Sequence, residues 1–171
     1  MPLLSVAMVD LEVAVTAVPA LVAGLPAETL RFRPAPDAWS MLEILHHLAD
    51  EEREDFPLRL RLTLEDPARP WPPIDPPGWV QARAYNRQDP QAVLKIFLSA
   101  RRANLDWLRR LEDPAWDHTH QHPKLGPMSA RNLLHAWCAH DLLHLRQLLQ
   151  RRWWLREQAA GPGQLDYAGK W

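Results

Sequence analysis

Two histidines four residues apart, His140 and His144, are the residues of this sequence best suited to chemistry. Side chains four apart lie on one face of an α-helix, so the two imidazoles would project side by side toward a single metal ion. The stripe that carries them, with Leu133, Trp137 and Leu148, is otherwise apolar and is predicted to face inward. A metal ion would satisfy one nitrogen on each buried ring. The pair alone equally fits two core histidines bonded to backbone or carboxylate groups.

A third histidine strengthens the metal hypothesis. His47 lies in the middle of a second predicted helix, roughly 10 Å along it, whereas His140 and His144 lie roughly 16–21 Å along theirs. If the two helices pack antiparallel, the three histidines can lie at the same height along the bundle. Three neutral imidazoles would leave coordination positions open, as catalytic rather than structural sites do. The sequence therefore predicts that His47, His140 and His144 bind one divalent metal ion.

Four segments with helical periodicity must position these side chains. The clearest start is the capping box of Ser40 and Glu43, with Trp39 and Ile44 as its hydrophobic staple. The predicted helices span residues 3–22, 40–56 with a kinked continuation past Pro57 to residue 64, 89–112, and 129–154. In the first helix, the face expected to be buried includes Val6, Val9 and Val13.

The connections complete an all-α prediction. Residues 66–88 are rich in proline and too long for a tight turn, so we expect a crossover that runs the length of the bundle between helices 2 and 3. Residues 116–127 are predicted to be a polar loop, and no strand alternation is visible. The predicted bundle domain covers residues 1–155, and an irregular tail covers residues 156–171.

Composition narrows the classes of partner. The formal charge is −1, from 20 basic and 21 acidic residues, so nucleic acid and an anionic membrane are not expected as partners. The Arg101-Arg102 and Arg109-Arg110 pairs are interpreted as a solvated face. The single cysteine, Cys138, cannot form an internal disulfide and is expected to be packed rather than nucleophilic. The apolar run near the N-terminus is interrupted by polar residues, glycine and prolines, which predicts a soluble, cytoplasmic protein.

Two stretches of the sequence resemble the DinB-like/YfiT-like metalloprotein superfamily. The first is Trp39-Ser40-x-x-Glu43-Ile44-Leu45-x-His47-Leu48-Ala49-Asp50-x-Glu52. The second is Leu125-Gly126-x-Met128-Ser129, followed by His140-x-x-x-His144-Leu145-Arg146-Gln147. The resemblance covers roughly residues 3–150, and it places the family's three ligands on His47, His140 and His144. The sequence departs from the family pattern at Arg146, where many members have glycine.

This resemblance implies an up-down-down-up four-helix bundle, commonly a homodimer, with zinc, nickel or iron in a cleft. Characterised relatives include S-transferases that use bacillithiol or mycothiol, and a thiol-dependent isomerase. Our leading hypothesis is therefore a metal-dependent enzyme that acts on a small-molecule substrate, either as a transferase with a low-molecular-weight thiol cosubstrate or as a hydrolase. The alternative is a non-enzymatic metal-binding or dimerising protein of the stress response.

A di-iron carboxylate bundle is the third interpretation. Glu43-x-x-His46 and Asp141-x-x-His144 resemble its carboxylate-x-x-His element, with Glu12 and Asp106 as the further carboxylates that it requires. Otherwise His46 is taken as the off-face neighbour of His47.

The remaining polar candidates have supporting roles. Metal-bound imidazoles usually donate their other N–H to a carboxylate or carbonyl, and Asp50, Glu51 and Asp141 are the candidates. A group of three loop histidines is expected to have a role without metal: His118, His120 and His122.

Overall fold

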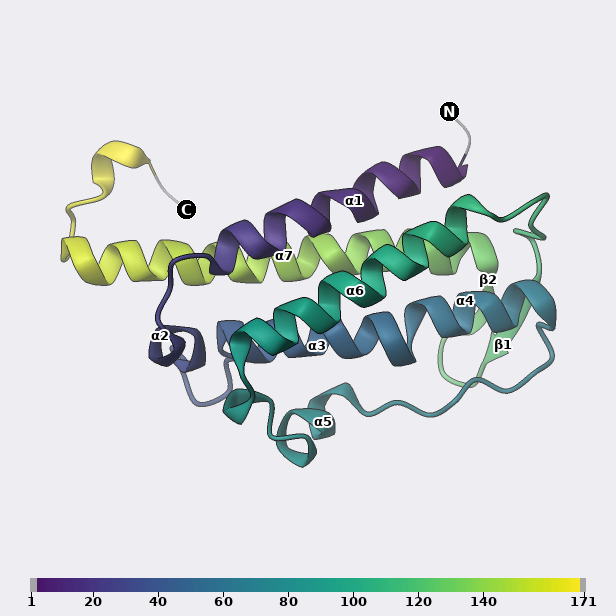
Figure 1. The fold of residues 1–171 in the computed structure, drawn as a ribbon, viewed down its shortest axis with the longest axis horizontal. Helices are drawn as coiled ribbons and strands as arrows, with labels where there is room; N and C mark the ends of the chain where they lie inside the picture. The colour runs from purple at the N-terminus through teal and green to yellow at the C-terminus, as the bar shows by residue number, and fades with distance from the viewer. Residues whose placement is uncertain (1–2, 170–171) are drawn as a thin grey trace.

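Four helical rods form the fold of the computed structural model, which describes residues 3–169. They are α1 (Leu3–Val22), α3 (Met41–Glu54) continued by α4 (Phe56–Glu65), α6 (Pro90–Arg109) and α7 (Ala130–Ala160). Figure 1 shows α1 and α7 running in one direction and α3–α4 and α6 in the other. The protein is therefore the predicted up-down-down-up four-helix bundle, in which α3 and α7 are antiparallel neighbours.

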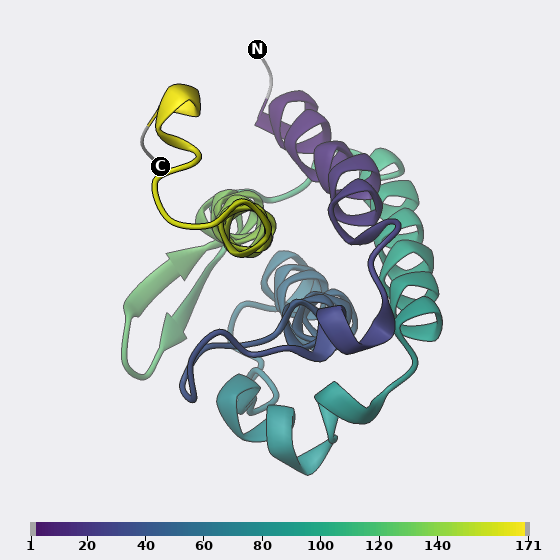
Figure 2. The same ribbon diagram turned by 90° about the vertical axis from the view of Figure 1, so that its left-hand side faces the viewer.

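The four rods enclose the core in a ring. Viewed along the bundle in Figure 2, α1 lies beside α6 and α7, and α3 lies beside α6 and α7. Two groups of buried apolar side chains fill the interior, one around Phe97 and the other around Trp137. The side chains that bridge α3 and α7 are the ones that build the candidate site.

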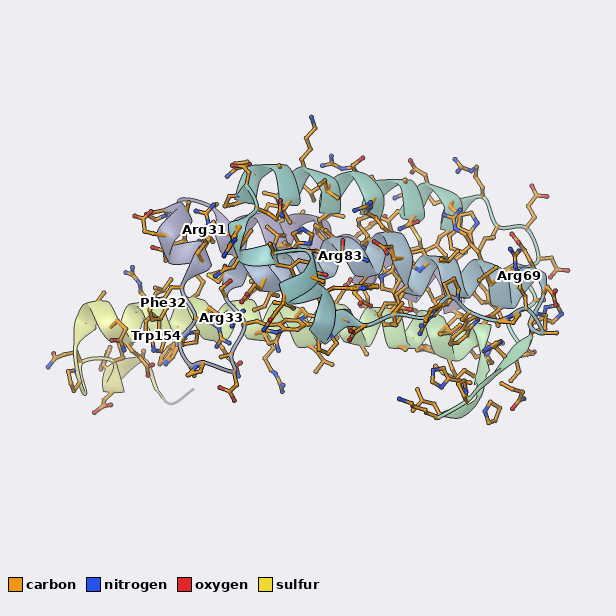
Figure 3. All side chains as sticks on the ribbon, turned by 90° about the horizontal axis from the view of Figure 1, so that it is seen from below. Arg31, Phe32, Arg33, Arg69, Arg83 and Trp154 are labelled. Carbon is orange, nitrogen blue, oxygen red and sulfur yellow. The ribbon has the colours of Figure 1, made fainter. Side chains whose placement is uncertain are left out.

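Two connections carry short helices. The first contains α2 (Ala27–Arg31), where Phe32 stacks on Trp154 of α7 with ring centroids 4.9 Å apart (Figure 3). The connection over residues 66–88 passes below α3–α4 in Figure 1 and contains α5 (Pro76–Ala82) and the 3₁₀ turn η1 (Tyr85–Arg87). Tyr85 and Arg83 fasten this segment to α3, because both donate hydrogen bonds to one carboxylate oxygen of Asp50, at 2.6 and 2.7 Å.

The predicted polar loop before α7 is instead partly a β-hairpin. Strand β1 (Thr119–His122) pairs antiparallel with β2 (Gly126–Ser129), and the hairpin projects from the bundle in Figure 2. The strand sequences, Thr-His-Gln-His and Gly-Pro-Met-Ser, do not alternate between apolar and polar residues, so they lack the period-2 pattern that identifies a strand in sequence. Gly126 has φ of +74°, which glycine adopts without strain in the tight return of the chain.

Helix boundaries mostly follow the predicted signals. Ser40, Asp89 and Ser129 each cap a helix by accepting a backbone N–H three residues on. The second rod breaks at Asp55 and continues past Pro57. The irregular tail predicted from residue 156 begins later, because no glycine or proline interrupts α7 before Gly161, whose φ is +90°.

The buried face of α1 differs from the prediction. Val6, Val9 and Val13 are exposed, whereas the core side of the helix consists of Ala7, Leu11, Ala14, Val18 and Val22. The helix is apolar around most of its circumference, so its pattern does not select one face. By length and composition α1 could cross a membrane, with a mean hydropathy of 1.8. Because it packs against α6 and α7, we interpret it as a bundle helix with an apolar outer strip.

Arg101 is the largest correction to the sequence analysis. Its side chain is fully buried rather than solvated. From α6 the guanidinium donates to Leu11 O on α1, to Glu52 on α3 and to both carboxylate oxygens of Asp141 on α7, at 2.6–2.9 Å. One side chain therefore binds all three other rods of the bundle.

Candidate metal centre

The capping box of α3 fixes the first of the three histidines. Ser40 Oγ accepts the Glu43 N–H at 3.1 Å, and the Glu43 carboxylate accepts the Ser40 N–H at 2.8 Å. The Arg33 guanidinium also bonds the Glu43 carboxylate, so this helix start is held from two sides. His47 follows in the second turn of α3, where its side chain is 4% exposed.

The other two histidines come from the inner face of α7. His140 is half-buried and His144 is 7% exposed. His140 Nε2 lies 3.1 Å from His47 Nε2 and 3.0 Å from His144 Nε2. One nitrogen of each ring therefore points at a common place between α3 and α7, and candidate ligand atoms of the three rings all lie within 4.8 Å of one another.

This geometry fits a metal ion. At the metal–nitrogen distance of about 2.0–2.1 Å found for histidine ligands, nitrogens 3.0–3.1 Å apart subtend roughly 90–100° at the ion. Such angles between His140 and each of the other two rings suit neighbouring ligands of an octahedral or distorted tetrahedral ion, and three protein ligands would leave further positions for small molecules. Without a metal, at most one of these two short contacts can be a well-formed hydrogen bond, because His140 Nε2 has either one hydrogen or one lone pair in the neutral ring.

The electrostatics favour unprotonated ligands. Burial, together with the nearby His144 ring, lowers the pKa of His47 to about 3. Burial and the two neighbouring rings lower the pKa of His140 to about 2, and burial also lowers the pKa of His144. All three rings are therefore neutral at physiological pH, as metal binding requires.

Aromatic side chains wall the cluster. Trp39, just before the cap of α3, has its ring centroid 5.0 Å from that of His47 and lies parallel to the His144 ring at 6.4 Å. Phe56 at the start of α4 lies 4.9 Å from His140. Sequence reasoning gave Trp39 only a capping role and gave Phe56 none. Positions nine residues apart lie on opposite faces of a continuous helix, so helical periodicity could not have placed Phe56 beside His47; the break at Asp55 lies between them.

The Nδ1 atoms of the three histidines, which point away from the cluster, have three different environments. His144 Nδ1 lies 2.8 Å from Gln147 Oε1. His47 Nδ1 lies 3.5 Å from Glu51 Oε1, and His140 Nδ1 is buried without a hydrogen-bond partner. Of the predicted carboxylate partners, Glu51 is therefore the one that approaches a ligand ring closely from the same helix.

The other two predicted carboxylate partners serve the scaffold. Asp141 binds Arg101, and Asp50 accepts from Tyr85 and Arg83. His46 Nδ1 lies 3.7 Å from Asp50, and the His46 ring stacks on Tyr85 rather than joining the cluster.

The carboxylates needed for a di-iron centre do not converge. Glu12 and Asp106 are exposed and pair with Arg109 on the outside of the bundle. Glu43 is occupied by the cap and by Arg33. Among residues 3–169, the side chains that cluster with metal-ligand geometry are the three histidines.

The hairpin histidines are held by backbone groups. His118 Nδ1 lies 3.0 Å from Leu64 O, and His120 Nδ1 lies 2.9 Å from Pro67 O. His122 Nδ1 accepts two backbone N–H groups within the hairpin turn. These contacts fasten the hairpin to the end of α4 and shape its turn.

Two further sequence candidates lie outside the cluster. Cys138 is buried, and burial raises the pKa of its thiol to about 12, so it is packed as expected. Arg146 is exposed on α7 and does not narrow the site.

Comparison with known families shows which family the chain belongs to. Residues 10–148 match the DinB superfamily. The chain belongs to this superfamily. A proposed metal-dependent hydrolase of Oceanobacillus iheyensis is 27% identical to this DinB protein over 119 residues, 68% of each chain. YfiT of Bacillus subtilis, also a proposed metal-dependent hydrolase, is 24% identical over 120 residues, 68% of this chain and 67% of YfiT.

Solved structures share the fold of this DinB protein. The structure of Bacillus subtilis YfiT, described as an unusual four-helix bundle, superposes with a TM-score of 0.77 at 19% identity and covers 86% of this chain and 85% of YfiT. A mycothiol-dependent maleylpyruvate isomerase superposes with a TM-score of 0.67 at 15% identity and covers 86% of this chain and 61% of the isomerase.

Proposed function

We propose that this DinB protein is a metal-dependent hydrolase of a small-molecule substrate, with His47, His140 and His144 as the ligands of one divalent ion. The observation that carries the proposal is the approach of the three Nε2 atoms from α3 and α7, at 3.0 and 3.1 Å. The two relatives named as proposed metal-dependent hydrolases support the reaction class. Zinc, nickel and iron are the candidate ions, since imidazole ligands suit all three.

The chain's own residues prepare the site for this chemistry. The three neutral rings offer lone pairs without first losing protons, and α3 and α7 hold His47 and His144 next to His140, with Nε2 atoms 3.0–3.1 Å apart. Trp39 and Phe56 keep two sides of the cluster apolar, which strengthens electrostatic interactions inside it. When bound, a divalent ion would supply Lewis acidity and lower the pKa of a small nucleophile, water or a thiol, toward neutrality.

Transfer of a low-molecular-weight thiol is the second candidate function. It is favoured by the structural likeness to an isomerase that depends on mycothiol. Cys138 is the single cysteine and is buried, so the thiol in such a reaction would have to be an external cosubstrate of the bacillithiol type. Hydrolysis needs no cosubstrate, and this difference separates the two functions experimentally.

Metal analysis tests the site, and a substrate screen tests the reaction. Protein purified without a histidine tag should contain close to one divalent ion per chain, and His140→Ala should lose it. The loaded protein should then hydrolyse esters or amides without added thiol; turnover only with added thiol would select the transferase. A protein that binds no metal and gains no stability from it would instead support the non-enzymatic bundle.

The oligomeric state and location belong to the same proposal. We propose a cytoplasmic homodimer, with the exposed valine strip of α1 as the surface that supports pairing. Light scattering on the purified chain tests the dimer, and Val9→Glu should shift it toward the monomer.

A further inference from the structure

Gln147 defines how the His144 ring is presented. It lies three residues after His144 on α7, and its Oε1 is 2.8 Å from His144 Nδ1. An amide oxygen only accepts hydrogen bonds, so His144 Nδ1 must carry the hydrogen and donate it. The lone pair of the neutral ring is then on Nε2, the atom that faces His140 at 3.0 Å.

Glu51 has the equivalent position on α3. It lies four residues after His47, and its Oε1 is 3.5 Å from His47 Nδ1. Both atoms are buried and neither has a hydrogen-bond partner. Because an unpaired buried polar group costs free energy, the two atoms have reason to close the remaining gap of about half an ångström.

His140 differs from both, because its Nδ1 is buried and unpartnered. Its Nε2 is the atom that contacts both other rings. Its orientation therefore depends on packing against Phe56 and on where the other two rings are held. The Gln147 hydrogen bond, together with the longer Glu51 contact, would be enough to set the geometry of the whole cluster.

We propose that Gln147 and Glu51 are positioning residues of the metal centre, which hold His144 and His47 with Nε2 directed at the ion. The inference rests on the proposed metal function, since it concerns how the same three rings bind. It selects Glu51 from the three carboxylate candidates of the sequence and gives a role to Gln147, which the motif contains without assigning it one. Hydrogen bonds of this kind around a metal site are commonly worth 10–100-fold in metal affinity.

The affinity test uses the full chain and Zn²⁺, with dissociation constants from competition against a chelating indicator. Gln147→Leu keeps the size of the side chain and removes the acceptor, so zinc binding should weaken 10–100-fold. Gln147→Glu keeps an acceptor oxygen and should bind zinc as tightly as the parent chain. Gln150→Leu, the same change one turn on, is the matched control and should have no effect.

A spectroscopic test separates positioning from general stability. In the metal-free chain, ¹⁵N NMR should show the His144 hydrogen on Nδ1. Gln147→Leu should give a mixture of tautomers, whereas Gln147→Glu should restore the parent state. Thermal unfolding midpoints establish that each variant is folded, and Gln147→Met provides a second variant without an acceptor oxygen if the leucine variant does not fold.

Glu51 on α3 is tested in the same way. Glu51→Leu should weaken zinc binding, and Glu51→Gln, which retains a carbonyl oxygen, should restore most of the affinity. Because the Glu51 contact is longer, its loss should cost less affinity than the loss of Gln147.

His144→Ala separates failure of the proposed metal centre from failure of the proposed positioning residues. If His144→Ala binds zinc as well as the parent chain, the proposed metal centre is wrong. If His144→Ala loses zinc while Gln147→Leu and Glu51→Leu keep parental affinity, the centre stands and the positioning inference is overturned. Equal losses in Gln147→Leu and Gln147→Glu would also overturn it, since the acceptor oxygen would then be irrelevant.

Discussion

Removing the buried Arg101 side chain should severely destabilise the bundle. Arg101→Met retains an unbranched apolar stem but leaves Glu52 and Asp141, which are 3% exposed each, without their cation. The variant also loses four hydrogen bonds at 2.6–2.9 Å, one of them to Leu11 O. Breaking a buried pair by removing one partner costs about 3–5 kcal/mol. For a chain of this length, that loss lowers the unfolding midpoint by roughly 6–20 °C.

The pH dependence of this loss identifies its cause. Burial raises the pKa of Asp141 to about 6 even with Arg101 beside it. Without the guanidinium, that pKa rises further. The folded variant then binds more protons than its unfolded chain at mildly acidic pH, so its stability falls as the pH rises through the folded pKa. The difference from the parent chain should therefore be large at pH 8 and smaller at pH 5.

Urea unfolding followed by circular dichroism measures both effects. Arg102→Met is the matched control, because Arg102 is the exposed neighbour on α6, and it should change stability by about 0.5 kcal/mol or less. The charge-free combination of Arg101→Met, Glu52→Gln and Asp141→Asn should recover much of the loss. A cost for Arg101→Met below about 1 kcal/mol would refute the reasoning, since surface ion pairs contribute that little. So would a cost that is the same at pH 5 and pH 8.

Three further predictions address the site and its helix. His144→Ala should reduce zinc affinity far more than His120→Ala, because His120 stacks on Trp71 and bonds Pro67 O; equal losses in a chelator competition would count against the ligand assignment. Ser40→Ala should cost about 1–2 kcal/mol in urea unfolding, because it removes the cap of α3. The exposed Ser5→Ala is its control, and a cost no larger than the control's would rule out the capping role. In the metal-free protein, buried His47 and His140 should each cost about 1.4 kcal/mol of stability per pH unit below 6.5, because the unfolded chain takes up protons that these rings do not. The raised pKa values of Glu51 and Asp141 act in the opposite direction, so the comparison is His140→Ala, which removes one ring and retains both carboxyl groups. A loss of stability between pH 6.5 and 5 that is as steep in His140→Ala as in the parent chain would contradict the burial of a neutral ring.

The features predicted correctly from the sequence have local signals. The capping box at Ser40, the caps at Asp89 and Ser129, and the kink at Pro57 depend on neighbouring residues, so single-sequence reasoning located them. The bundle topology and the involvement of His47 depended on the family resemblance as well, because the spacing of one helix cannot reveal which other helix it meets.

The errors concern partners that lie far apart in the chain. Arg101 looks like half of a surface arginine pair, and its burial follows from carboxylates 49 and 40 residues away. In the sequence Asp141 is a candidate partner for a ligand histidine, but in the fold its carboxylate accepts hydrogen bonds from Arg101. For α1, the exposed valines and the buried alanines are all apolar, so the choice of face is made by α6 and α7. The hairpin gave no strand signal, because its two strands contain almost no apolar residues that could alternate with polar ones.

The 93 residues that separate His47 from His140 have a consequence for biosynthesis. A ribosome releases α3 long before α7, and a nascent chain that ends within α6 contains only one of the three proposed ligands, His47. All three rings become available together only after residue 144 has been translated and α7 has docked. If the proposed site binds its ion, capture would therefore be a late event in the life of the polypeptide, and truncated chains would be left without it.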